Sequence, residues 1–240
     1  MKTTRKLIPA LVMLLVSAIM LSTASFAWFA TSTEVTAENM TVKAKANTKF
    51  LQISDKATEG WNTFVSLEDL GNKELDLVKP VITAEKRLEK WQTATSNNSS
   101  TGAVNAEGYQ DVAADSLGGY VLKVDLWVKM SDNSNATLSH LKIEDVASVA
   151  ANDGTESSLA KALRVLVVGE SGGLQLWTNE TGTWAADPSY TAAILTSVTQ
   201  DAQKITVYVY YDGDSSVANS DTAVPDSLTN MQVSVTFSAE

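Results

Sequence analysis

The sequence predicts an all-β protein, built as a two-sheet antiparallel sandwich that is jelly-roll-like and carries one or two short helices. The first observation is alternation: in Tyr120–Met130 every second side chain is apolar, while Lys123 and Asp125 lie between them. A period of two is typical of a half-buried strand. The second observation is that Ile205–Tyr211 and Met231–Phe237 repeat this pattern. The third is that polar loops separate about nine such segments, as in sandwich proteins.

The remaining predicted strands are shorter: Met40–Ala46, Phe50–Ile53, Thr63–Leu67, Leu138–Val146, Leu163–Val168 and Leu174–Thr178. Between the last two, Gly172-Gly173 predicts a tight hairpin. Helix is favoured at two places. Thr83–Trp91 contains good helix formers with its apolar residues on one side, and Ser157–Leu163 is long enough for one or two turns.

The start of the chain is typical of a secretory signal peptide, predicted to span residues 1–27. A positive segment precedes the apolar run Leu7–Met20, and its basic residues are Lys2, Arg5 and Lys6. Small residues then end the segment. The run is shorter than the roughly 20 residues of a membrane span, so an uncleaved anchor is the less favoured alternative.

The cleavage site is predicted from the small residues. Ser25 and Ala27 satisfy the small-x-small requirement, so we expect the mature chain to begin at Trp28, with Ser22 and Ala24 as a second option. The protein is therefore expected to work outside the cytoplasm, in an extracellular matrix or at the cell surface. It would meet a membrane only before cleavage.

Composition and charge limit the classes of partner that we expect for this chain. It has 240 residues, with 18 basic and 28 acidic side chains and no cysteine. Cleavage after Ala27 would leave 213 residues and, because three basic side chains are lost, a net charge of −13. Such an acidic chain is a poor partner for nucleic acid or anionic lipid. We expect an N-terminal arm over residues 28–38 and a single sandwich domain over residues 39–240.

Five segments at the two ends of the chain carry a family resemblance. They are Leu21–Phe29, Thr31–Val35, Asn39–Ala44, Val207–Asp214 and Leu228–Phe237. Together they resemble secreted Gram-positive proteins of the TasA/camelysin type. The resemblance implies a jelly-roll domain, a dedicated signal peptidase, and polymerisation into the fibres of a biofilm matrix. In such fibres the freed N-terminal segment adds as a strand to the next subunit. Because a single added strand gives little net binding energy, an accessory matrix protein is a further expected partner.

The predicted arm has the composition of a strand that could be donated. It contains neither Gly nor Pro, and its strand-favouring residues include Trp28, Phe29, Thr31, Thr33 and Val35. A free segment of this kind can pair with an open sheet edge, where main-chain hydrogen bonds give affinity. Head-to-tail addition of this kind does not close on itself, so it predicts a homopolymer. An ordinary first strand or a frayed terminus is the alternative.

Enzymatic chemistry is not expected, although camelysin-like proteins are sometimes classed as metallopeptidases. The chain has one histidine, His140, and no H-E-x-x-H pattern. Gly169-Glu-Ser-Gly-Gly173 has the G-x-S-x-G spacing, but it lies in the predicted hairpin between two strands and not in the strand-to-helix turn that a nucleophile elbow requires. With one histidine and no cysteine, a catalytic zinc would need an otherwise all-carboxylate shell, which is unusual. His140 is expected to be a surface residue of a strand.

Two further features leave alternatives open. Asp212 and Asp214 lie at alternate positions in a loop, which suits calcium, although Asp-Gly is also a plain turn signal. No other cofactor is expected. Five tryptophans of the predicted domain suggest a rival function, a secreted carbohydrate- or host-surface-binding module, and they are Trp61, Trp91, Trp127, Trp177 and Trp184. Trp127 lies on the polar face of its strand; in the alternative interpretation the Thr83–Trp91 segment and long loops cover that face and bury the rings.

Overall fold

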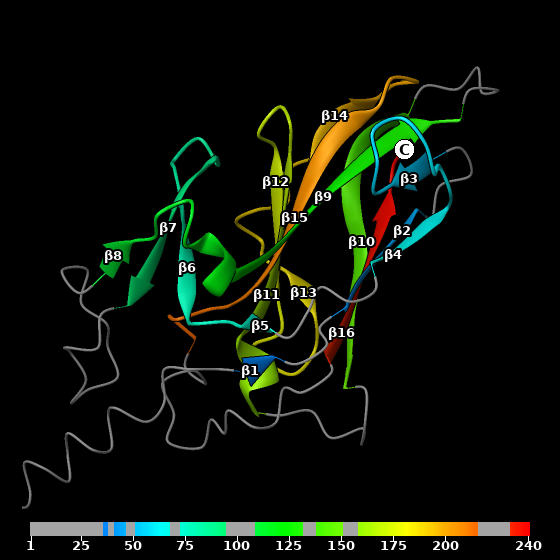
Figure 1. Ribbon diagram of the computed structural model, residues 1–240. Coiled ribbons are helices and arrows are strands. Elements are labelled where there is room, and N and C mark those ends of the chain that lie inside the picture. The colour runs from blue at the N-terminus through cyan, green and yellow to red at the C-terminus, as the bar shows by residue number, and fades with distance from the viewer. Residues whose placement is uncertain are drawn as a thin grey trace, which may run out of the picture. The chain divides into compact units, whose positions relative to one another are not determined.

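Two sheets that share one apolar core confirm the predicted all-β sandwich (Figure 1). The computed structural model describes residues 36–37, 41–46, 51–67, 73–94, 109–131, 138–150, 158–215 and 231–240. These residues belong to one unit of the chain, Glu34–Glu240. Within the described part, no helix has the length and hydropathy needed to cross a membrane.

The first sheet, sheet I, has five strands, and the last strand of the chain lies at its centre. In spatial order they are β14 (Leu195–Val198), β10 (Leu138–Ala150), β16 (Met231–Ser238), β2 (Thr41–Ala46) and β4 (Phe64–Leu67). β16 runs antiparallel to β10 and parallel to β2, so residues near the two ends of the described chain are direct neighbours. The remaining pairs of this sheet are antiparallel.

The second sheet, sheet II, has six strands and is wholly antiparallel. Its order is β13 (Ala185–Ala186), β12 (Leu174–Thr178), β11 (Leu163–Gly169), β15 (Gln203–Tyr211), β9 (Val121–Met130) and β3 (Leu51–Ser54). The predicted hairpin between β11 and β12 is confirmed. Gly172 takes a φ of +81° at its turn, a conformation that side chains with a Cβ rarely adopt.

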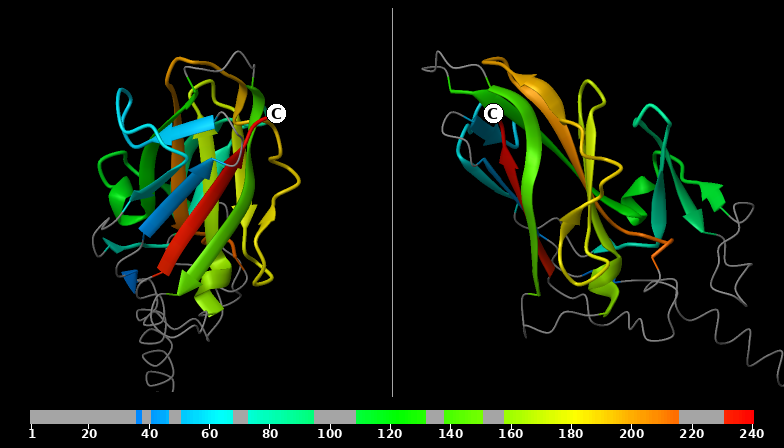
Figure 2. Two further views of the ribbon diagram at one scale, coloured as in Figure 1. Left: turned by 90° about the vertical axis from the view of Figure 1, so that its right-hand side faces the viewer. Right: turned by 180° about the vertical axis from the view of Figure 1, so that it is seen from behind.

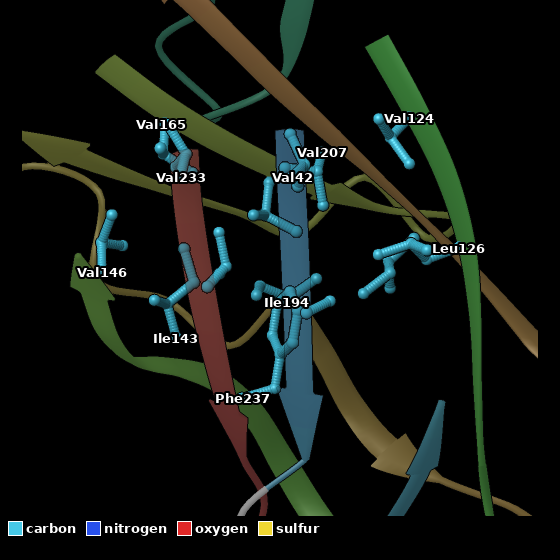
Figure 3. Packing of buried hydrophobic residues seen from close by; sticks show 14 of the residues in the cluster. Val42, Val124, Leu126, Ile143, Val146, Val165, Ile194, Val207, Val233 and Phe237 are labelled. Atoms are coloured by element: carbon cyan, nitrogen blue, oxygen red, sulfur yellow. The ribbon is translucent and has the colours of Figure 1, made fainter. Parts of the chain in front are cut away.

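The core lies between the two sheets, and the alternation of the sequence decides which side chains enter it. Val233 and Phe237 of β16 are 0% exposed, whereas Ser234 and Thr236 between them are half-buried on the outer face. Figure 3 shows Val233 near Val42 of β2, and Phe237 near Ile194, within this cluster. All nine predicted strands are present, with ends that differ by a few residues.

A third sheet of three strands corrects the predicted helix over Thr83–Trp91. Its strands are β6 (Val78–Ile82), β7 (Leu88–Ala94) and β8 (Tyr109–Asp111), which pair in the order β6-β7-β8. Helix propensity is a weak preference that tertiary packing overrides. Here Trp91 is buried at 6% exposure between Tyr208 and Tyr210 of β15, with ring centroids 5.4 and 4.9 Å away. This packing adds a layer to part of the outer face of sheet II.

The other expected helix is confirmed as a short 3-10 helix, η3 (Ser158–Ala162). A second 3-10 turn, η2 (Leu117–Gly119), precedes β9. Two short strands, β1 (Thr36–Ala37) and β5 (Lys73–Glu74), pair antiparallel. Figure 2 shows these elements from two further sides.

Candidate functional site

Strand β4, one of the two edge strands of sheet I, is the feature most suited to receiving another strand. β4 pairs with β2 on one side, and within the described part of the chain no strand pairs with its other side. An unpaired edge presents main-chain N–H and C=O groups from alternate residues. Phe64 begins this strand and is 59% exposed, and it is the large apolar side chain that stands out as exposed among the described residues.

The neighbouring edge of sheet II is partly closed. β3 and β4 are joined by residues 55–63, and this loop returns along β3. Asn62 exchanges both main-chain hydrogen bonds with Ile53, at N–O distances of 2.8 and 3.1 Å. Ser54 Oγ further fastens the loop by donating to the carbonyl of Glu59 at 2.6 Å. The edge of β3 is therefore occupied at its middle, and β4 is the more open of these two edges.

The opposite side of the sandwich is closed by residues 187–194, which cross between the sheets. The amide of Asp187 donates to Leu176 of β12, and the amide of Ile194 donates to Leu141 of β10, both at 2.8 Å. Gln175 of β12 ties the same side: its side-chain oxygen accepts from the amide of Ile143 at 2.7 Å. Sheet I and sheet II are thus linked on this side by chain and hydrogen bonds.

The predicted arm meets the described residues only at its C-terminal end. The cleavage residues Ser25, Ala27 and Trp28 lie outside the described part of the chain, as do Phe29, Thr31, Thr33 and Val35. Thr36 and Ala37, which fall within the predicted arm of residues 28–38, pair with Glu74 and Lys73 of the same chain. Any segment available for donation therefore ends before Thr36.

The two predicted calcium ligands, Asp212 and Asp214, each lie beside a basic side chain. Asp212 Oδ2 is 3.2 Å from Nε of Arg164, and Asp214 Oδ2 is 3.1 Å from Nζ of Lys79. Burial raises the pKa of Asp212, and the charge of Arg164 opposes that rise. Groups of three or more His, Cys, Asp or Glu arranged to hold a metal are absent from the described residues. Calcium binding here stays a prediction.

Sequence reasoning did not single out Arg164, which is the centre of a buried polar cluster. Its side chain is 3% exposed and pairs with Glu180 as well as with Asp212. Its guanidinium also donates to the carbonyls of Lys161 and Leu163, at 2.7 and 3.0 Å. We call Arg164, Glu180 and Asp212 the Arg164 cluster. In the sequence, this cluster is indicated only by a basic residue, Arg164, inside the apolar run Leu163–Val168.

His140 is exposed on β10, as expected, and it adopts a φ of +54°. The residues beside it make strand contacts: Ser139 pairs with Ser197 and Leu141 pairs with Leu195 of β14. The pairs on both sides of His140 keep the same register, so this residue departs from strand dihedrals without adding a residue to the ladder.

Comparison with protein-family models finds no match for this chain, and comparison with curated proteins finds none either.

Proposed function

We propose that this chain is a secreted structural subunit that polymerises outside the cell by donating its N-terminal arm to the next copy. Residues 28–35 of one copy would add as a strand to the edge of β4 in another. The observation that carries the proposal is this open edge, with Phe64 exposed on it. The composition of the arm and the resemblance to TasA/camelysin-type proteins support the same reading.

The free energy gained when one arm adds to one β4 edge is small compared with the cost of association. β4 has four residues, so an added strand forms a few main-chain hydrogen bonds, each worth about 1 kcal/mol net. Covering Phe64 adds roughly 1–2 kcal/mol, since 59% of it is still exposed. Association costs roughly 4–15 kcal/mol. Apolar arm residues that fill pockets, a high local concentration or an accessory protein would therefore be needed for long polymers.

The experiment is electron microscopy and sedimentation of the secreted protein and three variants. Thr33→Pro removes a main-chain donor from the arm, and Phe64→Lys places a charge on the receiving edge. Both should yield folded monomers where the parent protein forms filaments. Thr196→Lys, which places the same charge at an exposed position of the other edge strand of sheet I, β14, should leave filaments unchanged. Filaments that persist in both test variants would refute strand donation to β4.

The second candidate function, binding of a carbohydrate or host surface, is favoured by one specific observation. Trp61 and Trp127 belong to neither of the two buried apolar clusters of the described residues. This function is compatible with the first, since a matrix subunit can also carry a ligand face.

A further inference from the structure

Among the described residues, the three-stranded sheet covers one half of the outer face of sheet II and leaves the other half uncovered. Over the covered half, the three-stranded sheet packs Trp91 against Val121, Tyr210 and Leu166. Further along β9 and β15 the same face carries polar side chains instead. In register order Lys123 lies opposite Tyr208, Asp125 opposite Thr206, and Trp127 opposite Lys204.

The tryptophans of the described residues differ in whether they pack into an apolar cluster. Of the five tryptophans in the described part of the chain, Trp91 belongs to the second apolar cluster, and Trp177 and Trp184 pack against the first. Trp61 and Trp127 are half-buried and join neither. Burial of large apolar rings is the usual reason to place a tryptophan in a sandwich. These two rings contribute to no core and lie on a partly accessible surface.

Lysines accompany both rings. Nζ of Lys129 lies 4.9 Å from the ring centre of Trp61, and Nζ of Lys204 lies 5.8 Å from that of Trp127. Lys204 is held by Asp125 at 2.7 Å, and Asp125 in turn accepts from Thr206 Oγ1 at 2.8 Å. The ammonium groups of Lys129 and Lys204 are therefore positioned by contacts with neighbouring side chains.

Lysines outnumber carboxylates among the side chains around Trp127, whereas the chain as a whole is acidic. We call Trp61, Lys123, Asp125, Trp127, Lys129 and Lys204 the Trp127 face. It contains three lysines against one aspartate, with Glu170 at its rim, whose carboxylate accepts from the amide of Lys204 at 3.2 Å. The whole chain has a net charge of −10. A locally basic surface on an acidic protein attracts anions, while the rest of the molecule repels them.

We propose that the Trp127 face binds an acidic polysaccharide, a chain of pyranose rings that carry carboxylates. The rings would lie against the apolar surfaces of Trp61 and Trp127, and the carboxylates would meet Lys123, Lys129 and Lys204. Aromatic rings supply apolar contact area, and fixed ammonium groups supply charge recognition. The lysines, Asp125 and Trp127 of this face lie on β9 and β15 of sheet II, and Trp61 lies in the loop that leads into β4, whereas the proposed receiving strand β4 belongs to sheet I.

The test is a titration of the purified protein with oligogalacturonate, followed by calorimetry and tryptophan fluorescence. We expect saturable binding with a change in fluorescence, and affinity that falls as salt is added. A neutral cello-oligosaccharide of equal length should bind at least about ten-fold more weakly, which corresponds to about 1.4 kcal/mol. Linear polyphosphate distinguishes charge alone from a charged sugar: equal affinity for polyphosphate would overturn the proposal, as would equal affinity for the neutral sugar.

Variants locate the site. Trp127→Ala and Lys204→Gln should each weaken oligogalacturonate binding at least about ten-fold while the circular dichroism spectrum stays unchanged. Lys90→Gln, at an exposed lysine paired with Asp111 on β8, should bind as the parent protein does. Phe64→Lys should also keep full binding, which separates this face from assembly. Unaltered binding in both Trp127→Ala and Lys204→Gln, or no binding by the parent protein at millimolar sugar, would overturn the proposal.

Discussion

Replacing Arg164 by Met tests whether the Arg164 cluster stabilises the fold. Arg164 is 3% exposed and the side chain of Asp212 is 22% exposed, so removing the guanidinium leaves a largely buried carboxylate without its cation. Breaking a buried pair in this way costs about 3–5 kcal/mol. Glu180 is 41% exposed, so water screens its interaction with Arg164. Most of the lost stability therefore comes from the pair of Arg164 with Asp212. For a chain of this size the loss lowers Tm by roughly 6–20 °C.

The effect of Arg164→Met should depend on pH in a defined direction. Burial raises the pKa of Asp212 in the folded protein, and the positive charge of Arg164 lowers it. Without that charge the pKa rises further above its unfolded value. A carboxyl group with a raised folded pKa binds its proton more tightly when folded, so its cost to stability appears as pH rises through that pKa. The gap between variant and parent should therefore narrow as pH falls from 7 towards about 4.

The assay is urea unfolding followed by tryptophan fluorescence at pH 7 and pH 4.5. Lys90→Met is the matched control, because it removes a cation from an exposed pair with Asp111 and should leave the midpoint unchanged. Adding Asp212→Asn to Arg164→Met should recover part of the lost stability, since the uncompensated charge is then gone. A loss in Arg164→Met that is no larger than in the control, or that is the same at both pH values, would refute the reasoning.

Three other predictions address the core and the N-terminus. Val233→Asp should unfold the domain, whereas Ser234→Asp on the adjacent outward position should leave the thermal midpoint nearly unchanged; equal damage would contradict the one-sided burial of β16. Tyr211→Phe should leave stability equal or slightly higher, since the hydroxyl is buried without a hydrogen-bond partner among the described residues. A loss above about 1 kcal/mol in chemical unfolding would point to a bound water as its partner. N-terminal sequencing of secreted protein should begin at Trp28, and a mature chain that retains Met1 would contradict the proposed processing.

The strands could be predicted from the sequence because each is decided by neighbours two residues apart. Alternation in β9, β15 and β16 depends on local pattern alone, and it correctly assigned Val233 and Phe237 to the core. The segment around Trp91 could not be predicted in this way. The residues of this segment favour helix locally. However, the ring of Trp91 packs against Tyr208 and Tyr210, more than a hundred residues away in the sequence, and the burial of this ring decides the conformation of the segment.

The candidate sites were predictable only in part, for the same reason. The alternation of β9 placed Trp127 on the polar face, which the structure bears out. Its proximity to Lys204 follows from the register of β15 against β9, which no local pattern specifies. The open edge of β4 likewise follows from strand order. Arg164 was missed because its partners Glu180 and Asp212 follow two other strands.

The position of β16 between β10 and β2 has a consequence for biogenesis. Sheet I cannot be assembled until residues 231–238 have been synthesised, because that strand separates its two halves. Contacts between residues so distant in sequence make folding slow, since the closure entropy of a long loop is lost before they form. The part of the chain made before residue 231 therefore lacks the central strand of this sheet. For a protein exported as we propose, export that begins before residues 231–238 are made would carry an incomplete sheet I, and that sheet would be completed on the far side of the membrane.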